Sequence, residues 1–133
     1  MTLAEIKDQI MFQTNNDAED IDDYLPHVVD YINDGYDRLV SAWAKYHVPA
    51  GNYQRLEADT DVPNLPFWTH RALVDWATWL VYRNGNPQKQ NRGMAYYQAF
   101  QETLVRIAGE GGIDGLNADG SQKQYRNFRN IPR

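Results

Sequence analysis

The chain contains no cysteine, so it can form neither a disulfide framework nor a metal site with thiolate ligands. It also lacks any stretch close to the roughly 20 apolar residues that a membrane-spanning helix needs. Its first residues include no basic region followed by an apolar run, and so no secretory signal is visible. We therefore expect a soluble protein that is made in a cytoplasm and has no membrane contact.

Patterns typical of catalytic and metal sites are missing as well. Neither Ser41 nor Ser121 lies in a turn that would expose a nucleophilic serine. The acidic segment 17–23 lacks the alternating ligands, central glycine and closing glutamate of an EF-hand loop. The glycine-rich segment 109–112 lacks the lysine and the preceding strand of a phosphate-binding loop. The three histidines fit no zinc spacing: His27, His47 and His70. We predict no enzyme, no metal and no cofactor, although an enzyme site assembled only between subunits stays open.

What the chain does have is an uneven charge on a globular composition. Its 133 residues indicate one domain with a modest core, and 42% hydrophobic and 23% charged residues are typical of globular proteins. Residues 1–37 hold ten acids and one base, whereas residues 121–133 hold four bases and no acid. An acidic head and a basic tail favour partner binding, with a solvated surface and a disordered end as the alternative.

Helical periodicity predicts a mostly α fold, a small bundle of about four helices. The expected helices cover residues 2–14, 25–47, 65–83 and 86–108. Thr2 and Glu5 have the spacing of a capping box, Asn86 precedes a proline at the first helical position, and Gly109 is expected to end the last helix. The long connection 48–66 is expected to be an ordered excursion or short hairpin that makes contacts. We thus predict a helical domain over 1–108 and a flexible, glycine-rich linker with a basic tail over 109–133.

The expected third helix is apolar around most of its circumference. Its polar stripe is narrow and includes Arg71 and Asp75, which have the spacing of an ion pair; Thr78 and Tyr82 complete this stripe. An ordinary surface helix buries an arc of only about 100° or a little more. The excess is therefore predicted to contact another subunit through Trp68, Trp76 and Trp79, a residue type that interfaces favour. A bulky aromatic core is the alternative.

Two further surfaces are candidates for interaction. Asp30, Asp34 and Asp37 form a row on the polar side of the second helix, which we expect to be solvent-exposed and unpaired with bases. This row is either a solvated face or a deliberately negative surface. The tail combines spaced aromatic and basic residues that could anchor it in a protein groove: Lys123, Tyr125, Arg126, Phe128, Arg129 and Ile131.

Several strings resemble the head–tail adaptor (connector, or head-completion) proteins of tailed bacteriophages. They are Tyr31-Ile32-Asn33-Asp34-Gly35-Tyr36, Val62-Pro63-Asn64-Leu65-Pro66, His70-Arg71-Ala72-Leu73-Val74-Asp75-Trp76-Ala77 continuing to Tyr82-Arg83, and Tyr96-Tyr97-Gln98-Ala99-Phe100. The likeness covers about residues 3–108, and its motifs are packing patterns.

This resemblance implies a structural virion protein, assembled in the host bacterial cytoplasm and located at the head–tail junction. It implies a ring of identical subunits, commonly a dodecamer, that binds the portal protein and offers a docking surface to a tail or nozzle protein. DNA would pass through the ring without specific binding, the acidic row would face the channel, and the C-terminal tail would bind the portal. The alternative is a small regulatory module that binds a host protein through the Trp-rich third helix.

Overall fold

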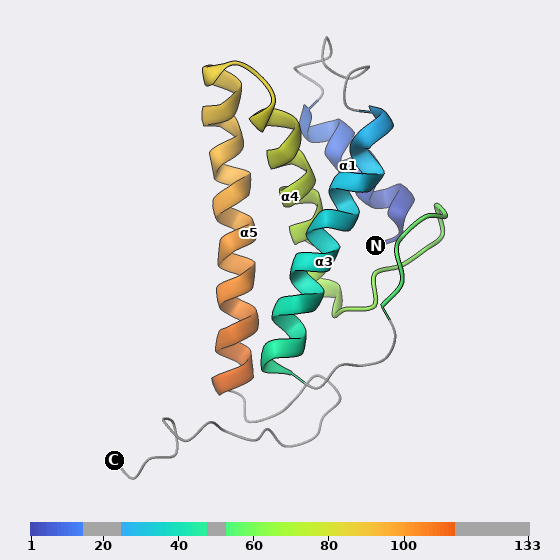
Figure 1. Ribbon diagram of the computed structural model, residues 1–133, viewed down its shortest axis with the longest axis vertical. Helices are drawn as coiled ribbons and strands as arrows, with labels where there is room; N and C mark the ends of the chain where they lie inside the picture. The colour runs from blue at the N-terminus through green and yellow to red at the C-terminus, as the bar shows by residue number, and fades with distance from the viewer. Residues whose placement is uncertain (15–24, 48–52, 114–133) are drawn as a thin grey trace.

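The computed structural model describes residues 1–14, 25–47 and 53–113. Within these ranges every regular element is a helix, which confirms the prediction of a mostly α bundle with four main helices. The elements in chain order are α1 (Leu3–Thr14), the short 3-10 helix η2 (Leu25–His27), α3 (Val28–Tyr46), the 3-10 helix η3 (Phe67–Thr69), α4 (His70–Arg83) and α5 (Pro87–Ile113). Figure 1 shows α3 and α5 as the long helices of the bundle.

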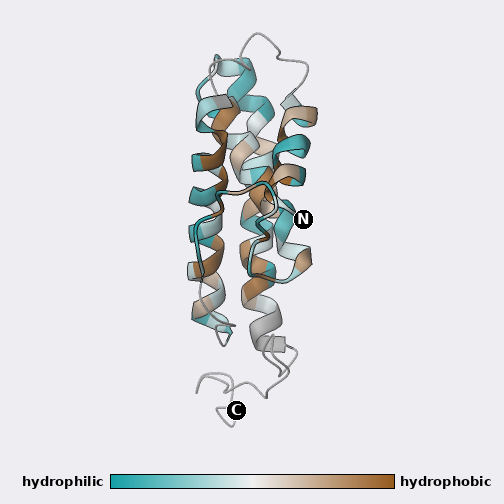
Figure 2. Ribbon diagram, turned by 90° about the vertical axis from the view of Figure 1, so that its right-hand side faces the viewer, coloured by the Kyte–Doolittle hydropathy of each residue, from teal (hydrophilic) through white to brown (hydrophobic). Residues whose placement is uncertain are grey.

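Helix α4 is the central element of this bundle. It contacts α1, α3 and α5, and ten of its fourteen residues are buried. The ribbons are brown, the colour of apolar residues, mainly where helices face one another (Figure 2). The largest fully buried side chains come from all four helices and include Leu3, Ile6, Ile32, Leu39, Leu73, Phe100 and Ile107. None of the described helices combines the length and the apolar character needed to cross a bilayer.

The start of α1 is fixed by its own side chains and by the connection that precedes η3. Thr2 N donates to Glu5 Oε1 at 3.1 Å, and Glu5 N donates to Thr2 Oγ1 at 3.2 Å. These bonds confirm the capping box. The amide and the hydroxyl of Thr2 both donate to the Glu5 carboxylate and hold the pKa of Glu5 below its usual value. The amide of Leu3 donates to the carbonyl of Asp61 at 2.8 Å, so a residue far along the chain satisfies one of the free amides of the first turn.

Two predicted helix ends differ from the structure. The third helix begins at His70 after η3, because Pro66 has an extended backbone (ψ 144°) that a continuous helix from residue 65 cannot contain. The last helix begins at Pro87 as predicted, but it continues past Gly109 to Ile113. A glycine costs a helix only about 1 kcal/mol and ends it where the backbone turns left-handed, so glycine content alone misplaced this end. The predicted domain boundary at 108 therefore lies inside α5.

Candidate interaction surfaces

Trp76 lies inside the bundle, so its predicted contact with another subunit is wrong. Its ring is 5% exposed and packs on Phe100 of α5 with ring centroids 4.7 Å apart. On the α3 side a Cβ built on Gly35 would come within 3.0 Å of the Trp76 ring, so the absence of a side chain there makes room for the indole. Trp76 Nε1 donates to Asp34 Oδ2 at 2.7 Å. The apolar excess of α4 is covered by its own neighbouring helices rather than by a partner.

Trp68 and Trp79 are only partly buried. Trp79 packs edge-on against Tyr97 with ring centroids 5.4 Å apart. Trp68 lies against Trp43, and the Arg106 guanidinium stacks over it, 4.0 Å from the ring centroid. Both tryptophans contact the core through one side and retain some solvent exposure. Their part in an oligomer interface stays a prediction.

The polar stripe of α4 faces α1, although its first member, Arg71, stays exposed. Arg71 pairs with Asp75 at 3.6 Å, as the spacing predicted, and also donates to Gln9 of α1 at 3.2 Å. Thr78 Oγ1 donates to Gln13 Oε1 at 2.9 Å. Burial raises the pKa of Asp75 despite the opposing charge of Arg71. The side of α4 that faces α1 is thus held by hydrogen bonds to the glutamine side chains of α1, in addition to apolar contacts.

The acidic row is at the surface, but two of its three members have basic partners. Asp30 and Asp37 are exposed and Asp34 is half-exposed. Asp30 pairs with Arg55, and Asp34 accepts from Arg38 Nε at 3.1 Å. The prediction of an unpaired row is therefore wrong for Asp30 and Asp34. Arg38 lies one turn from Asp34 on the same helix, so this pair could be expected from the local sequence. Arg55 reaches Asp30 from the facing connection, and no local pattern indicates that pair.

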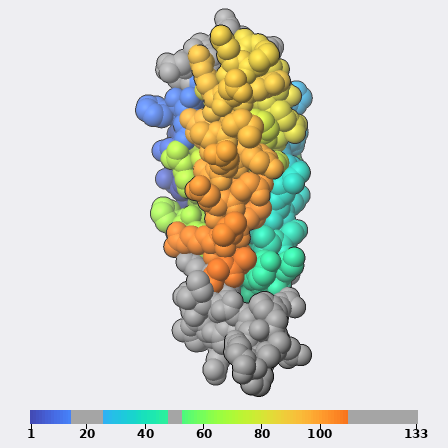
Figure 3. All heavy atoms as spheres, turned by 90° about the vertical axis from the view of Figure 1, so that its left-hand side faces the viewer, coloured from blue at the N-terminus to red at the C-terminus, as the bar shows by residue number. Residues whose placement is uncertain are grey.

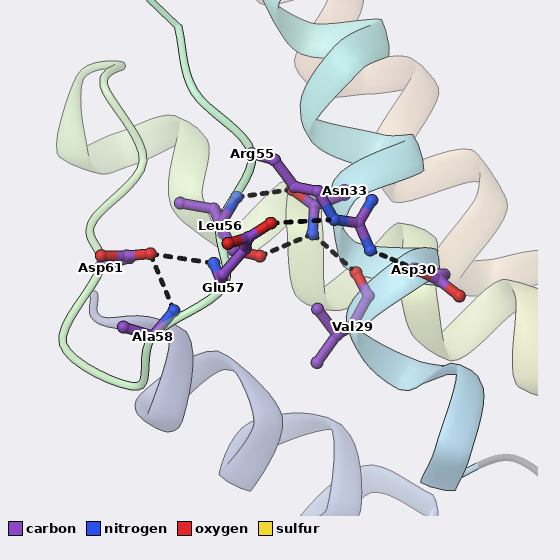
Figure 4. A network of polar contacts seen from close by, with 8 residues as sticks. All are labelled: Val29, Asp30, Asn33, Arg55, Leu56, Glu57, Ala58 and Asp61. Atoms are coloured by element: carbon purple, nitrogen blue, oxygen red, sulfur yellow. Dashed lines mark hydrogen bonds and ion pairs between the residues drawn. The ribbon is translucent and has the colours of Figure 1, made fainter.

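A buried amide joins α3 to the connection before η3 (Figure 4). Asn33 is 4% exposed; its Oδ1 accepts the amide of Leu56 at 2.8 Å and its Nδ2 donates to the Leu56 carbonyl at 2.9 Å. Nδ2 also donates to the Val29 carbonyl at 2.9 Å. One side chain therefore satisfies both backbone groups of Leu56, much as a neighbouring strand would. This ordered connection fits the expectation for residues 48–66 over its described part, 53–66.

Next to the hydrogen bonds between Asn33 and Leu56, which we call the Asn33 clamp, is a cavity of about 440 Å³. Its lining combines one buried tyrosine with residues of the connection: Tyr36, Gln54, Arg55, Leu56, Asp61, Val62, Pro63 and Asn64. The hydroxyl of Tyr36 accepts the amide of Asn64 at 2.8 Å, and burial raises the pKa of Tyr36. Asp61 Oδ2 accepts two backbone amides, of Glu57 and Ala58, which lower the pKa of Asp61. The sequence analysis did not identify this cavity, because it brings Tyr36 together with lining residues that are 18 or more positions further along the chain.

Other exposed apolar side chains were also missed. The most exposed are Phe12 on α1 at 81%, Phe67 on η3 at 73% and Val105 on α5 at 71%. Figure 3 shows the surface formed by α5, in orange, with α3 in teal along one side. These side chains lie on three different elements, and single exposed apolar residues are ordinary at protein surfaces.

The remaining candidate residues cannot be placed. The six tail residues and the acidic segment 17–23 lie outside the described residues. Among the residues that are described, no three histidine, aspartate or glutamate side chains come together in a way that could hold a metal ion. Comparison of the chain with models of protein families, with curated protein sequences and with solved structures gave no match.

Proposed function

We propose that the protein is a head–tail adaptor of a tailed bacteriophage, a structural component that joins the capsid portal to the tail and forms a ring extending the DNA channel. The observation that supports this proposal best is that the four strings carrying the resemblance contact one another. They come from α3, the connection, α4 and α5, and together they form the centre of the bundle.

The contacts between these strings are specific. Gly35 of the first string accommodates Trp76 of the third, and Tyr36 of the first accepts a hydrogen bond from Asn64 of the second. Trp76 packs on Phe100 of the fourth string. Sequence strings that contact one another in the structure describe a fold better than strings that lie apart in it. The resemblance therefore concerns a packing unit, which is the kind of likeness that a shared architecture would produce.

The acidic row suits a channel lining in chemical terms. Asp37 is exposed and forms no ion pair with any described residue, and Asp30 keeps its carboxylate at the surface beside Arg55. Carboxylates repel the phosphates of DNA, so a lumen with this charge would let DNA pass without binding it. Asp34 contributes less, because its carboxylate is held by Arg38 and by the Trp76 indole.

The first test is attachment of the purified protein to portal-bearing, DNA-filled capsids that lack their adaptor. A chain ending at Ile113 retains all of α5 and removes residues 114–133, which include the proposed portal-binding tail. We expect the full chain to co-sediment with these capsids and the shortened chain to stay in the supernatant with unchanged circular dichroism. Equal co-sedimentation of both chains would contradict the role of the tail, and no co-sedimentation of the full chain would contradict the adaptor function.

The second test concerns the channel. Asp37→Lys reverses a charge at an exposed position and should leave the fold intact, because exposed substitutions usually change stability by under about 0.5 kcal/mol. Glu102→Lys makes the same change of charge at an exposed position of α5, outside the row, and is the matched control. If Asp37 faces the lumen, Asp37→Lys should reduce DNA ejection from completed particles more than Glu102→Lys does. A ring structure with the row on its outer surface would refute the lumen assignment.

The alternative of a host-protein-binding module relied on an exposed face of the third helix. Because ten of the fourteen residues of α4 are buried, this helix offers little surface for such a partner. The adaptor proposal does not need that surface, since the outer helices and the connection remain available.

A further inference from the structure

Charged side chains gather in and around the cavity beside α3. The carboxylate of Asp61 and the guanidinium of Arg55 line it. Three further carboxylates flank it: Asp30 and Glu57 lie beside Arg55, and Asp37 follows the lining residue Tyr36 in α3. The net side-chain charge of this group is −3. We call the cavity and these flanking residues the acidic pocket.

The wall of the acidic pocket also presents a hydrogen-bond donor. Tyr36 is 3% exposed and lines the cavity. Its hydroxyl oxygen accepts the amide of Asn64, but its own proton has no acceptor among the described residues. A buried donor without an acceptor is costly unless a bound group or water satisfies it. Leu56 and Val62 add apolar surface beside this donor, so the pocket is equipped for a chain segment that has carbonyl groups, apolar side chains and positive charge.

The C-terminal segment, residues 121–133, has this composition. It carries four bases and no acidic side chain, for a side-chain charge of +4, and its aromatic residues are Tyr125 and Phe128. Between Ile113 and Lys123 are ten residue steps, which can span up to roughly 33 Å when extended. Attachment to the same chain gives such a segment an effective concentration in the millimolar range, enough to favour a weak site within the chain over the same site on another molecule.

We propose that the C-terminal segment of the free protein binds the acidic pocket of its own chain, with its basic side chains at the surrounding carboxylates and a backbone carbonyl at the Tyr36 hydroxyl. The inference does not require the proposed function. If the protein is an adaptor, the portal must displace the segment from the pocket, so the pocket would limit attachment until a portal is present.

The absence of cysteine allows a direct test on the full chain. Gln122→Cys introduces a single site for a nitroxide label near the start of the C-terminal segment. The label broadens the NMR signals of nearby amides, and the reduced label serves as the reference. We expect loss of peak intensity at Gln54 and Val62 of the pocket, and little loss at Gln98, an exposed residue of α5. Equal loss at all three positions would overturn the proposal.

Paired charge variants separate a specific contact from a general charge effect. Asp37→Asn with Glu57→Gln removes two carboxylates from the pocket and should restore most of the lost peak intensity. Asp8→Asn with Glu102→Gln makes the same change of net charge at exposed positions of α1 and α5 and should leave the broadening in place. If both pairs act alike, or neither acts, the pocket is not the binding site.

A mixing experiment identifies the source of the segment. Protein that is enriched in ¹⁵N but carries no nitroxide is mixed with nitroxide-labelled protein of natural isotope content. Any broadening of the observed signals then comes from another molecule. We expect no loss of intensity at Gln54 or Val62 in this mixture. Loss there would show that a second copy supplies the segment and would overturn binding within one chain. These NMR results are independent of capsid attachment, so failure of either proposal can be recognised separately.

Discussion

Replacement of Gly93 by alanine tests whether α4 and α5 pack as closely as the structure shows. Gly93 is buried in α5 opposite α4. A Cβ built at this position would lie 2.8 Å from Trp79 Cε3 and 2.8 Å from Tyr82 Cβ. Real Cβ atoms essentially never approach other heavy atoms this closely, so one helix would have to move. The indole could rotate, but Tyr82 Cβ is fixed to the backbone of α4.

Two opposing effects decide the sign of this substitution. In an exposed helix, alanine is more favourable than glycine by about 1 kcal/mol. Overpacking of a close-packed interior costs about 1–3 kcal/mol, and the two contacts at 2.8 Å place Gly93 toward the upper part of that range. We therefore expect Gly93→Ala to lower the free energy of unfolding by about 1–2 kcal/mol, measured by urea denaturation followed by circular dichroism.

Exposed Ala95, two residues further along α5, provides the matched control. Ala95→Gly reports helix propensity alone and should destabilise the chain by about 1 kcal/mol. The double variant Gly93→Ala with Trp79→Leu should be more stable than the sum of its single effects, because the smaller side chain relieves one of the two close contacts. If Gly93→Ala stabilises the protein by the amount that propensity predicts, the helices are further apart than described and the packing argument is refuted.

Three other substitutions follow from buried polar groups. Asn33→Ala should lower the free energy of unfolding by about 2–4 kcal/mol, because it leaves the backbone groups of Leu56 without partners. Arg55→Ala breaks only exposed ion pairs and should lower it by under about 1 kcal/mol. Similar losses in the two variants would contradict the role of Asn33. The folded state binds the proton of Asp75 more tightly than the unfolded state, so the wild type should lose stability as the pH rises from about 3.8 through the raised pKa of Asp75. Asp75→Asn should remove this loss and should not destabilise the chain at pH 7. Urea denaturation across pH 3–7 tests this, and the same pH profile for both proteins would show that the carboxyl is not desolvated. Burial lowers the pKa of His70, whose Nε2 donates to the Leu65 carbonyl at 2.9 Å while Nδ1 accepts from the Met1 amino group at 2.8 Å. The unfolded chain therefore binds a proton first as the pH falls below about 6.5, and stability should decline below that pH more in the wild type than in His70→Gln.

The sequence predicted local features of the fold well, because their causes are local. The capping box of Thr2 and Glu5 needs only residues three apart, and the start of α5 needs only Asn86 before Pro87. The ion pair between Arg71 and Asp75 likewise depends on helical spacing alone. Each of these features could be read from a window of five residues.

The position of α4 could not be predicted in the same way. Its apolar circumference indicated that most of the helix is buried, but not whether helices of the same chain or a partner protein bury it. The missed signal is the pair of glycines inside the flanking helices. Gly35 and Gly93 each cost about 1 kcal/mol of helix stability, and a glycine kept inside a helix frequently marks a close approach of another element. Here they receive Trp76 and Trp79. Asn33 and Leu56 were missed for a related reason, since a pairing 23 residues apart has no local pattern.

The central position of α4 also determines where partners can bind. A helix whose neighbours cover most of its circumference contributes stability and little surface, so a partner of this protein would bind mainly through the outer helices and the connection. Most carboxylates of those elements can be changed without loss of core packing, which makes charge variants such as Asp37→Lys informative about function. Asp34 is the exception. Its carboxylate accepts the buried indole of Trp76 at 2.7 Å while half of its side chain faces solvent. A substitution at Asp34 would alter the core and the acidic row together, so a defect in Asp34→Lys alone could not be assigned to the surface.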